Sequence, residues 1–531
     1  MGARLFGWGT ESGDLSAAEA HALLDRVRPW LAVTEPVDPP TLSEVDLAPP
    51  RLAPAGPVSA WLRTDPLARA THTYGQGYRD LVRRLERRFA PAPDVVAVPP
   101  DENGVVATLE WADAHDAVVV PFGGGTSVVG GIEAPSDDPR PVVSLDLEGL
   151  HGVIEVDTAS RVARCRAGTR GPDLEAALAP YGLTLRHFPQ SFEFSTVGGW
   201  LATHAAGHYA TGPTRIDDAV ASLRAVTPRG ILDTGRHPSW GAGPDVRALV
   251  LGSEGTLGVI TETWLRVVAR PTFHARAVAR FADVEAGIAA SRAIAQSGLR
   301  PANARLLDPV EAAVSGAGDG NEALLLLACE SADHPVSGEM TRLRELAADH
   351  GAKLRDGVGR PDAPWRDAFV RAPYARDVLV RAGLLVETFE TVTTWDRLDT
   401  LRHAVVDAAA AALAASGSPG GLVSWRLTHL YPDGAALYLT VLAPARARDR
   451  VGQIDEVRAG LLAVLADAAA PVTHHHAVGR VHQPAHTASS PALATALLVS
   501  AKAVLDPRGL LNPGVLVASS RPGHQPRDHV G

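Results

Sequence analysis

The sequence of 531 residues predicts an α+β fold with two principal domains. Short Val-rich runs bounded by Pro, Gly and Asp recur between residues 94 and 268, as expected for the strands of a sheet. A helical pattern between two of these runs predicts a strand–helix–strand unit. From about residue 271, longer Ala-rich helical patterns alternate with strands, which predicts a second domain.

Residues 1–85 are expected to form a helical and extended lead-in. Residues 16–27 have helical spacing behind a Ser cap, and residues 78–89 form a second amphipathic pattern. The segment 35–57 is rich in Pro and has no periodicity, so it is expected to connect the two helices in an extended form.

The first domain is placed at residues 86–271. The patterns predict strands at 94–99, 117–121, 141–146, 151–157, 161–167, 219–227 and 257–268, and helices at 102–115 and 172–180.

The second domain is placed at residues 272–465 and is expected to cap the first. Its predicted helices are 285–297, 336–350 and 398–416, and its predicted strands are 323–329 and 434–442. The remaining segment, 466–531, holds a His cluster and a turn at Asn512-Pro513-Gly514, and we expect it to pack back on the first domain and complete the active site.

The composition excludes several classes of protein. The net charge of −10 and the lack of a long basic run argue against nucleic acid as a partner. Cys165 and Cys329 are the only cysteines and lie far apart, which favours a reducing cytoplasm over a disulfide scaffold. No signal peptide and no stretch of the ~18 apolar residues that span a membrane is recognised.

Three loops combine glycines with hydroxyl side chains and could hold an anionic ligand. They begin at Pro121, Gln190 and Gly252. Glycine lets backbone N–H groups approach phosphate oxygens closely. A dinucleotide-binding loop of the Rossmann type would need a helix directly after its glycines, but Gly130, Gly131 and a nearby proline follow the first loop, so that interpretation is rejected.

In order and spacing, the three loops resemble the FAD-binding domain of the vanillyl-alcohol oxidase and p-cresol methylhydroxylase superfamily. The segments 124–128, 192–200 and 227–231 resemble its alkyldihydroxyacetonephosphate synthase family, and the resemblance runs from Gly7-Trp8-Gly9 to the His cluster. It implies FAD bound non-covalently, since the first loop has no His. The implied FAD-binding residues are Pro121, Phe122, Gly123, Gly124, Gly125, Thr126, Ser127, Gln190, Ser191, Phe192, Glu193, Phe194, Ser195, Thr196, Thr203, His204, Ala205, Ala206, Glu254, Gly255, Thr256, Leu257, Gly258, Val259 and Ile260.

Tyr431 is the first catalytic candidate. It stands before a Pro-Asp-Gly turn at the end of an expected strand, where a packed rim aromatic is the simpler alternative. The phenol has a pKa near 10, so its use as a base requires a neighbour that favours phenolate. The family carries a catalytic Tyr in a similar Thr-x-x-Tyr-x-x-Gly-Ala setting, which Tyr431 matches.

His474, His475 and His476 are the second group. In an extended strand, His474 and His476 would share one face and His475 would point the other way. An exposed polar strand is the alternative. No metal site is predicted, because no carboxylate or cysteine accompanies the cluster at a useful spacing. The resemblance implies that these histidines act in catalysis, by polarising a carbonyl or assisting Tyr431.

Arg376 is the third candidate, with a local Arg–Asp pair with Asp377 as its alternative. A guanidinium suits a phosphate through its planar fork. A similar Tyr-x-Arg-Asp in the family implies that Arg376 binds the substrate phosphate.

The resemblance implies an enzyme that exchanges the acyl group of acyl-dihydroxyacetone phosphate for a fatty alcohol, without net redox change. A lipid substrate further implies transient contact with a membrane surface, and the resemblance implies a homodimer. The alternative is a flavin dehydrogenase of a 2-hydroxy acid such as D-lactate or glycolate. Tyr438 and His475 stand where those dehydrogenases carry His and Glu, whereas the tail from Leu505 to Gly514 resembles theirs.

Overall fold

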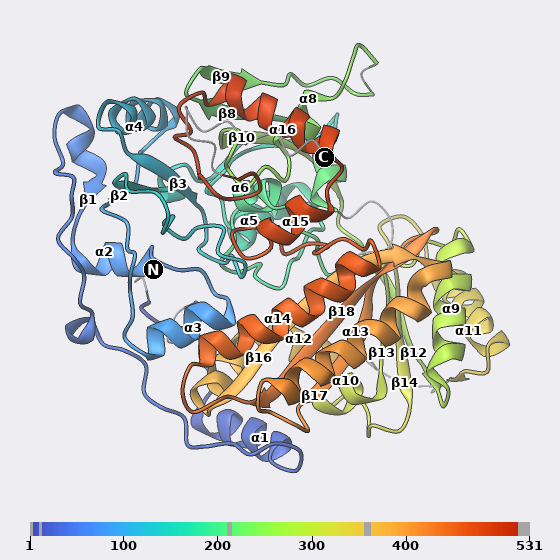
Figure 1. The fold of residues 1–531 in the computed structure, drawn as a ribbon. Helices are drawn as coiled ribbons and strands as arrows, with labels where there is room; N and C mark the ends of the chain where they lie inside the picture. The colour runs from blue at the N-terminus through green and yellow to red at the C-terminus, as the bar shows by residue number, and fades with distance from the viewer. Residues whose placement is uncertain (1–3, 10–12, 210–214, 240, 355–362, 519–531) are drawn as a thin grey trace, which may run out of the picture.

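The structure, a computed structural model, describes residues 4–9, 13–209, 215–239, 241–354 and 363–518; the side chains of residues 363–368 are not described. The chain forms two sheet-containing domains that face each other (Figure 1). The α+β class predicted from the sequence is confirmed.

The first domain contains two main sheets. Parallel pairs dominate one of them, with the order β1-β2-β4-β3, and the other is antiparallel with the order β5-β6-β10-β8-β9. Its strands are β1 (Leu62–Arg63), β2 (Val95–Ala97), β3 (Val118–Phe122), β4 (Val142–Asp146), β5 (Val153–Asp157), β6 (Val162–Arg166), β8 (Val220–Thr227), β9 (Gly230–Asp233) and β10 (Val259–Arg266). A small pair joins β7 (Leu183–Thr184) to β11 (Val268–Ala269).

Helices connect these strands and carry the loops between them. They are α4 (Glu102–Ala114), α5 (Gly171–Leu178), α6 (Val197–Ala202), α7 (Ile216–Ala219) and α8 (Val246–Val250). The helix α4 begins at Asp101, whose side chain accepts a hydrogen bond from the N–H of Gly104, and it links β2 to β3 as the sequence predicts. One apolar core lies beneath both sheets and includes Val119, Leu145 and Trp200.

The second domain is built on one antiparallel sheet of seven strands in the order β15-β12-β14-β13-β17-β18-β16. The strands are β12 (Phe273–Phe281), β13 (Asn303–Leu307), β14 (Ala323–Ser331), β15 (Lys353–Leu354), β16 (Leu384–Thr394), β17 (Leu422–Leu430) and β18 (Gly434–Pro444). Figure 1 shows α9 (Val284–Gln296), α11 (Ser337–Asp349), α13 (Trp395–Ala415) and α14 (Arg450–Asp467) over one face of this sheet.

Alternation along β18 separates the two faces of the seven-stranded sheet. Leu437, Leu439 and Val441 belong to the core beneath the helices, whereas Tyr438 and Thr440 line a cavity on the opposite face. The helices α10 (Pro309–Val314) and α12 (Ala363–Arg381) pack on that cavity side.

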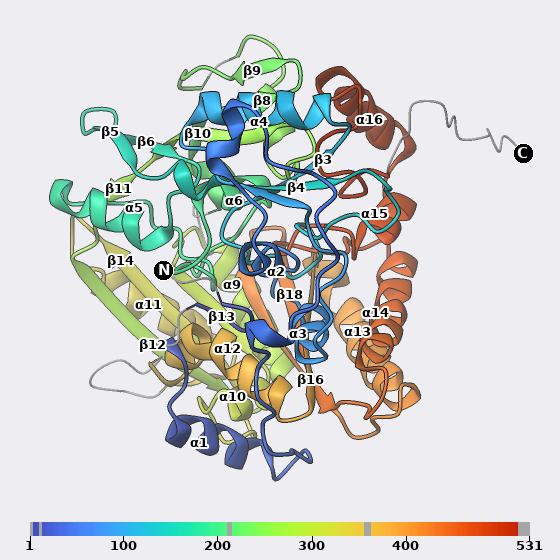
Figure 2. The same ribbon diagram turned by 90° about the vertical axis from the view of Figure 1, so that its left-hand side faces the viewer.

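Both ends of the chain contact the two domains. The N-terminal helices are α1 (Ala17–Val27), α2 (Pro66–Thr71) and α3 (Tyr78–Leu85), and Figure 2 shows α1 at the end of the second domain remote from the first. The tail forms α15 (Gln483–Ser489) and α16 (Ala492–Leu505) and then returns to β3, where Leu511 pairs with Val119. The predicted return of the tail to the first domain is therefore observed.

All the helices and strands predicted from the pattern are present, with ends shifted by a few residues. The longer elements that the sequence pattern did not predict are the strands β12, β13, β16 and β17 and the helices α12, α14 and α16. Cys165 and Cys329 are buried free thiols. Among the helices formed by the described residues, none combines the length and apolar character needed to cross a bilayer.

Candidate active site

A cavity of about 760 Å³ lies between the glycine loops of the first domain and the sheet of the second. Arg376, His475 and His476 line it, whereas the predicted catalytic residues Tyr431 and His474 do not. Most of the residues predicted to bind FAD also line the cavity. These are Pro121, Phe122, Gly123, Gly124, Gly125, Thr126, Ser127, Gln190, Ser191, Ser195, Thr196, Thr203, Ala205, Ala206, Glu254, Gly255, Gly258, Val259 and Ile260. The three loops thus meet at one site.

The loops interlock through glycines that no other residue could replace without displacement. A Cβ at Gly124 would lie 1.9 Å from the carbonyl oxygen of Phe194, and one at Gly123 would lie 2.5 Å from Oγ1 of Thr196. Gly255 has φ +73° and packs against Pro121. The result is a cavity wall of closely spaced backbone at the ends of strands, which suits the phosphates and flat rings of FAD.

Six of the predicted FAD-binding residues support the loops instead of lining the cavity. Phe192 stacks on Trp200, Phe194 packs against Trp8, and Tyr374 donates a 3.1 Å hydrogen bond to Glu193. His204, Thr256 and Leu257 are likewise absent from the cavity wall. The side chain of Thr256 donates to the carbonyl of Ser253, and Leu257 is fully buried.

Tyr431 is held at a hairpin between β17 and β18. Its backbone exchanges hydrogen bonds with Gly434, so the Pro-Asp turn predicted from the sequence is present. Its Oη lies 2.7 Å from Nε2 of His474 and 3.5 Å from Nη1 of Arg215. Burial raises the pKa of Tyr431, while the positive charge of Arg215 opposes that rise.

The three consecutive histidines do not form a strand, so the predicted alternation of their side chains is wrong. Residues 472–476 form an irregular bend in which the backbone N–H groups of His474, His475 and His476 all point at one oxygen of Glu390. A buried acceptor that binds three successive donors outweighs the ladder hydrogen bonds that a strand would need.

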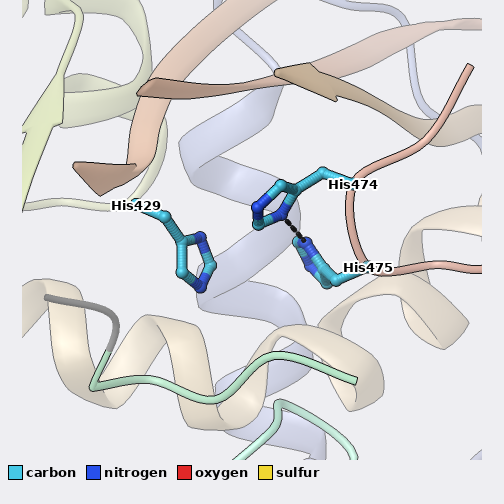
Figure 3. Close-up of side chains that lie close together, drawn as sticks. All are labelled: His429, His474 and His475. Atoms are coloured by element: carbon cyan, nitrogen blue, oxygen red, sulfur yellow. Dashed lines mark hydrogen bonds between the residues drawn. The ribbon is translucent and has the colours of Figure 1, made fainter. Parts of the chain in front are cut away.

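Glu390 also places a carboxylate beside the histidines. No metal site was predicted from the sequence because no carboxylate stands near the histidines along the chain. Glu390 comes from β16, more than 80 positions away in sequence from the histidines it contacts. His429, His474 and His475 have ring nitrogens that lie within 4.8 Å of one another, as do ligand atoms of Glu390, His475 and His476. Figure 3 shows the first group, with a 3.0 Å contact between the Nδ1 atoms of His474 and His475.

A bulge in β17 brings His429 into this group. The register against β18 shifts between Leu427 and His429, so Thr428 and His429 both line the cavity although they are consecutive. Without the bulge, His429 would face the core beneath the helices. The sequence showed His429 but gave no signal for the bulge.

The histidines around Glu390 are largely neutral. Burial lowers the pKa of His474 to about 3 and that of His476 to about 4, and it holds the pKa of His429 well below its usual range. Although burial alone would raise the pKa of Glu390, the facing His475 and His476 hold it well below the usual value. The site therefore combines one buried carboxylate anion with several neutral imidazoles.

A second buried glutamate fixes the other end of the histidine loop. The oxygens of Glu254 accept hydrogen bonds of 2.9 and 2.8 Å from the N–H groups of Val478 and Gly479. Burial raises the pKa of Glu254 to about 7 in spite of these bonds. Since Glu254 belongs to the first domain and Glu390 to the second, the loop is fixed to both sides of the cavity.

Arg376 lies in the wall of the cavity beside the N-terminal segment. Its guanidinium donates to the carbonyl of Gln76 and lies over the ring of Trp8, 5.7 Å from the centroid. The neighbouring Asp377 accepts a 2.8 Å hydrogen bond from the N–H of Trp8. Burial raises the pKa of Asp377 to about 6. The guanidinium is therefore available at the cavity wall, and the alternative of a purely local pair with Asp377 is not favoured.

We predict that His482 makes folding stability depend on pH. Burial lowers the pKa of His482 to about 4, and Arg458 reinforces the shift. The folded state therefore binds fewer protons than the unfolded state between about pH 4 and 6.5. Lowering the pH from 7 to 5 should cost the protein about 2 kcal/mol of unfolding free energy relative to His482→Gln. Urea unfolding at both pH values measures this difference, and equal pH slopes in the two proteins would contradict it.

Two family models match most of the chain. The model described as "FAD binding domain" matches residues 93–235, and the model described as "FAD linked oxidases, C-terminal domain" matches residues 270–516. Their boundary falls between the two domains that face the cavity.

Individual proteins are similar over nearly the whole chain. Alkyldihydroxyacetonephosphate synthase of Dictyostelium discoideum is 30% identical over 483 residues, which cover 86% of this chain and 78% of the relative. A solved structure of alkyldihydroxyacetonephosphate synthase superposes with a TM-score of 0.80 at 25% identity, covering 96% of this chain and 97% of the other. A structure of p-cresol methylhydroxylase shares the fold, with a TM-score of 0.70 at 14% identity over 95% of this chain and 98% of the other.

Proposed function

This chain belongs to the alkyldihydroxyacetonephosphate synthase family of FAD-dependent enzymes, and we propose that it exchanges the acyl group of an acyl-dihydroxyacetone phosphate for a fatty alcohol. The observation that carries the proposal is the contact of 2.7 Å between Tyr431 Oη and His474 Nε2, with His474 in turn against His475 of the cavity wall. A phenol held in this way can take and return a proton.

In the proposed reaction, Tyr431 removes a proton next to the substrate carbonyl. Arg215, 3.5 Å away, stabilises the negative charge that the phenol oxygen carries before it takes the proton. The neutral His476 lines the cavity beside His475 and donates a hydrogen bond to the carbonyl oxygen as it becomes negative. The fatty acid then leaves as a carboxylate, and a fatty alcohol enters in its place and gives up its hydroxyl proton to solvent. Tyr431 returns the proton that it removed to the carbon next to the carbonyl, which completes the exchange.

FAD, when bound, would supply an electrophilic ring system for the exchange. The residues that would hold it are the backbone of Gly123 to Ser127, the second loop around Ser195 and Thr196, and the third loop around Gly255. We propose that the cofactor is bound non-covalently, since no His or Cys lies between residues 121 and 127.

The cavity also offers room for an aliphatic chain. Beyond the loops, its wall includes apolar side chains from α1 and the residue before its cap, from α10 and α12, and from the sheet, namely Leu15, Ala22, Leu23, Val314, Leu379, Val386 and Leu442. In both Figure 1 and Figure 2, α1 lies at the end of the second domain remote from the FAD-type sheets. Burial of an acyl chain against such a wall contributes about 0.8 kcal/mol per CH₂.

The experiment uses the purified yellow holoenzyme under anaerobic conditions. Mixing with palmitoyl-dihydroxyacetone phosphate should change the flavin absorbance and release palmitate, and adding hexadecanol should give the ether-linked ketone phosphate. If D-lactate alone bleaches the flavin and yields pyruvate while the acyl ketone phosphate does nothing, the protein is instead a 2-hydroxy acid dehydrogenase.

We predict that Arg376→Lys raises KM for the acyl ketone phosphate by about 100-fold, within the ~2–5 kcal/mol expected on loss of a buried charged hydrogen-bond partner. A lysine keeps the charge but loses the two-pronged fit to phosphate. The matched substrate is acyl-dihydroxyacetone, which has no phosphate. The variant and the parent should turn it over alike, and an equal loss with both substrates would count against phosphate recognition by Arg376.

The other expectations form part of the proposal. They are the domain limits 1–85, 86–271, 272–465 and 466–531, a cytoplasmic location with transient contact to a membrane surface, and a homodimer. Sedimentation of the holoenzyme with and without lipid vesicles tests the membrane contact and the homodimer together, because vesicle binding and dimer formation both change the sedimenting mass.

A further inference from the structure

We infer that Glu390 is a positioning residue that sets the proton positions in a chain of side chains ending at Tyr431. The inference rests on the proposed role of Tyr431 as the base. The chain runs from Glu390 through His475 and His474 to the phenol oxygen. No feature of the sequence around Glu390 placed it at the site.

The carboxylate of Glu390 is almost completely enclosed, with a side-chain exposure of 2%. Its Oε1 accepts hydrogen bonds from the N–H groups of His474, His475 and His476 at 3.1, 2.6 and 2.5 Å, and from Oγ1 of Thr473 at 2.8 Å. Its Oε2 faces Nδ1 of His475 at 2.5 Å. Oε1 therefore holds the histidine loop in shape, whereas Oε2 faces the imidazole of His475.

The proton positions along the chain follow from this arrangement. A carboxylate oxygen 2.5 Å from Nδ1 of His475 requires that nitrogen to carry a proton, because two lone pairs would repel. Nδ1 of His474 lies 3.0 Å from Nδ1 of His475. Since Nδ1 of His475 is the protonated partner, Nδ1 of His474 must be the unprotonated acceptor. A neutral His474 then carries its proton on Nε2 and donates it to Tyr431 Oη, 2.7 Å away.

The consequence is a phenol oxygen that receives hydrogen bonds and keeps its own proton free for exchange. His474 Nε2–H and the guanidinium of Arg215 both face Oη and both favour phenolate. If the tautomer of His474 were reversed, Tyr431 would instead donate its proton to Nε2 and would be a weaker base. Glu390 selects the first arrangement without touching the substrate.

Glu390→Gln reverses this selection while conserving shape. The amide oxygen must take the place of Oε1, since three backbone N–H groups point there. The NH₂ group then faces His475 and donates to Nδ1, so His475 moves its proton to Nε2. His474 Nδ1 becomes the donor, its Nε2 becomes an acceptor, and Tyr431 is left as the donor to Nε2.

The negative charge of Glu390 acts on the pKa of Tyr431 in the opposite direction from the hydrogen bond of His474, and its effect is weaker. The carboxylate alone disfavours phenolate at Tyr431, and its removal would lower the pKa of the phenol. That effect acts across two imidazole rings, whereas the hydrogen bond acts at 2.7 Å. Among the described residues, other charged or titratable groups around the chain include Arg215, Asp217, Arg305, Arg426, His429, Tyr438, His476 and His482.

We expect Glu390→Gln to lower kcat by about 100-fold and to move the acidic limb of the pH–rate profile upward by about one pH unit. The same shift should appear without any substrate. The phenolate absorbance of the holoenzyme near 295 nm, measured against Tyr431→Phe as the blank, should titrate at higher pH in Glu390→Gln than in the parent. Adding Glu390→Gln to Tyr431→Phe should cost little further activity.

Glu387→Gln is the matched control. Glu387 lies three residues earlier on β16, is buried, and accepts a 3.1 Å hydrogen bond from Arg458 on the far side of the sheet. This variant should lose melting temperature but keep the pH profile and the phenolate titration of the parent. If Glu390→Gln behaves in the same way, or if its effect adds fully to that of Tyr431→Phe, Glu390 has only a structural role. A phenolate shift in a protein that fails to turn over acyl-dihydroxyacetone phosphate would overturn the proposed function and leave this inference standing.

Discussion

Tyr431→Phe should lower kcat by about 1,000-fold, within the ~10²–10⁴ range for loss of general acid–base catalysis. The substitution removes the single oxygen that lies between His474 Nε2 and the guanidinium of Arg215. It leaves the ring in place, and Tyr431 is not among the residues that line the cavity. FAD content and melting temperature should therefore stay close to those of the parent. Steady-state kinetics measures kcat, and the flavin-to-protein absorbance ratio measures the FAD content.

Tyr78→Phe is the matched control for that substitution. Tyr78 is fully buried, and its hydroxyl has no hydrogen-bond partner among the described residues. Replacing it should leave turnover unchanged. Near-normal turnover in Tyr431→Phe would remove Tyr431 from the catalytic role and would transfer the search for the base to His475 and His476.

Gly124→Ala should release FAD. A Cβ at this position would lie 1.9 Å from the carbonyl oxygen of Phe194, and a backbone atom cannot move aside as the end of a side chain can. The first and second loops must separate, which costs about 1–3 kcal/mol of strain. The dissociation constant for FAD should rise by at least tenfold, and the protein should be purified partly colourless. Fluorescence titration of the apoprotein with FAD gives the constant.

Gly338→Ala serves as the comparison for the glycine substitution. Gly338 lies near the start of α11, and a Cβ there meets nothing within 4 Å. Its FAD affinity should equal that of the parent. Tight FAD binding by Gly124→Ala would mean that the loops tolerate separation and that the close approach at Gly124 is not what holds the cofactor site together.

The pattern of the chain was sufficient for most of the first domain. Short strands separated by turn residues and the glycine loops depend on local preferences, which can be recognised within a few residues. The same is true of α1, whose Ser16 and Glu19 form the expected capping box. The second domain was less readable, because β16 is a long strand with polar residues on both faces. Glu387 and Glu390 interrupt β16, and their partners Arg458 and His475 come from distant segments.

By itself, the sequence determined the α+β class, the three loops that approach one another, and the choice of Tyr431, the histidines and Arg376 as candidates. The fold class and the loops depend on residue type and local spacing, whereas the choice of candidates rested on the resemblance to a known family. Only the tertiary structure decided how the candidates are arranged. The bend at His474–His476 exists because Glu390 and Glu254, from different domains, accept the backbone donors of that loop. The bulge at Thr428 turns His429 into the cavity. Hydrogen bonds between segments far apart in the chain leave no periodic trace in the sequence, so only the folded chain shows which tautomers and which proton path the site allows.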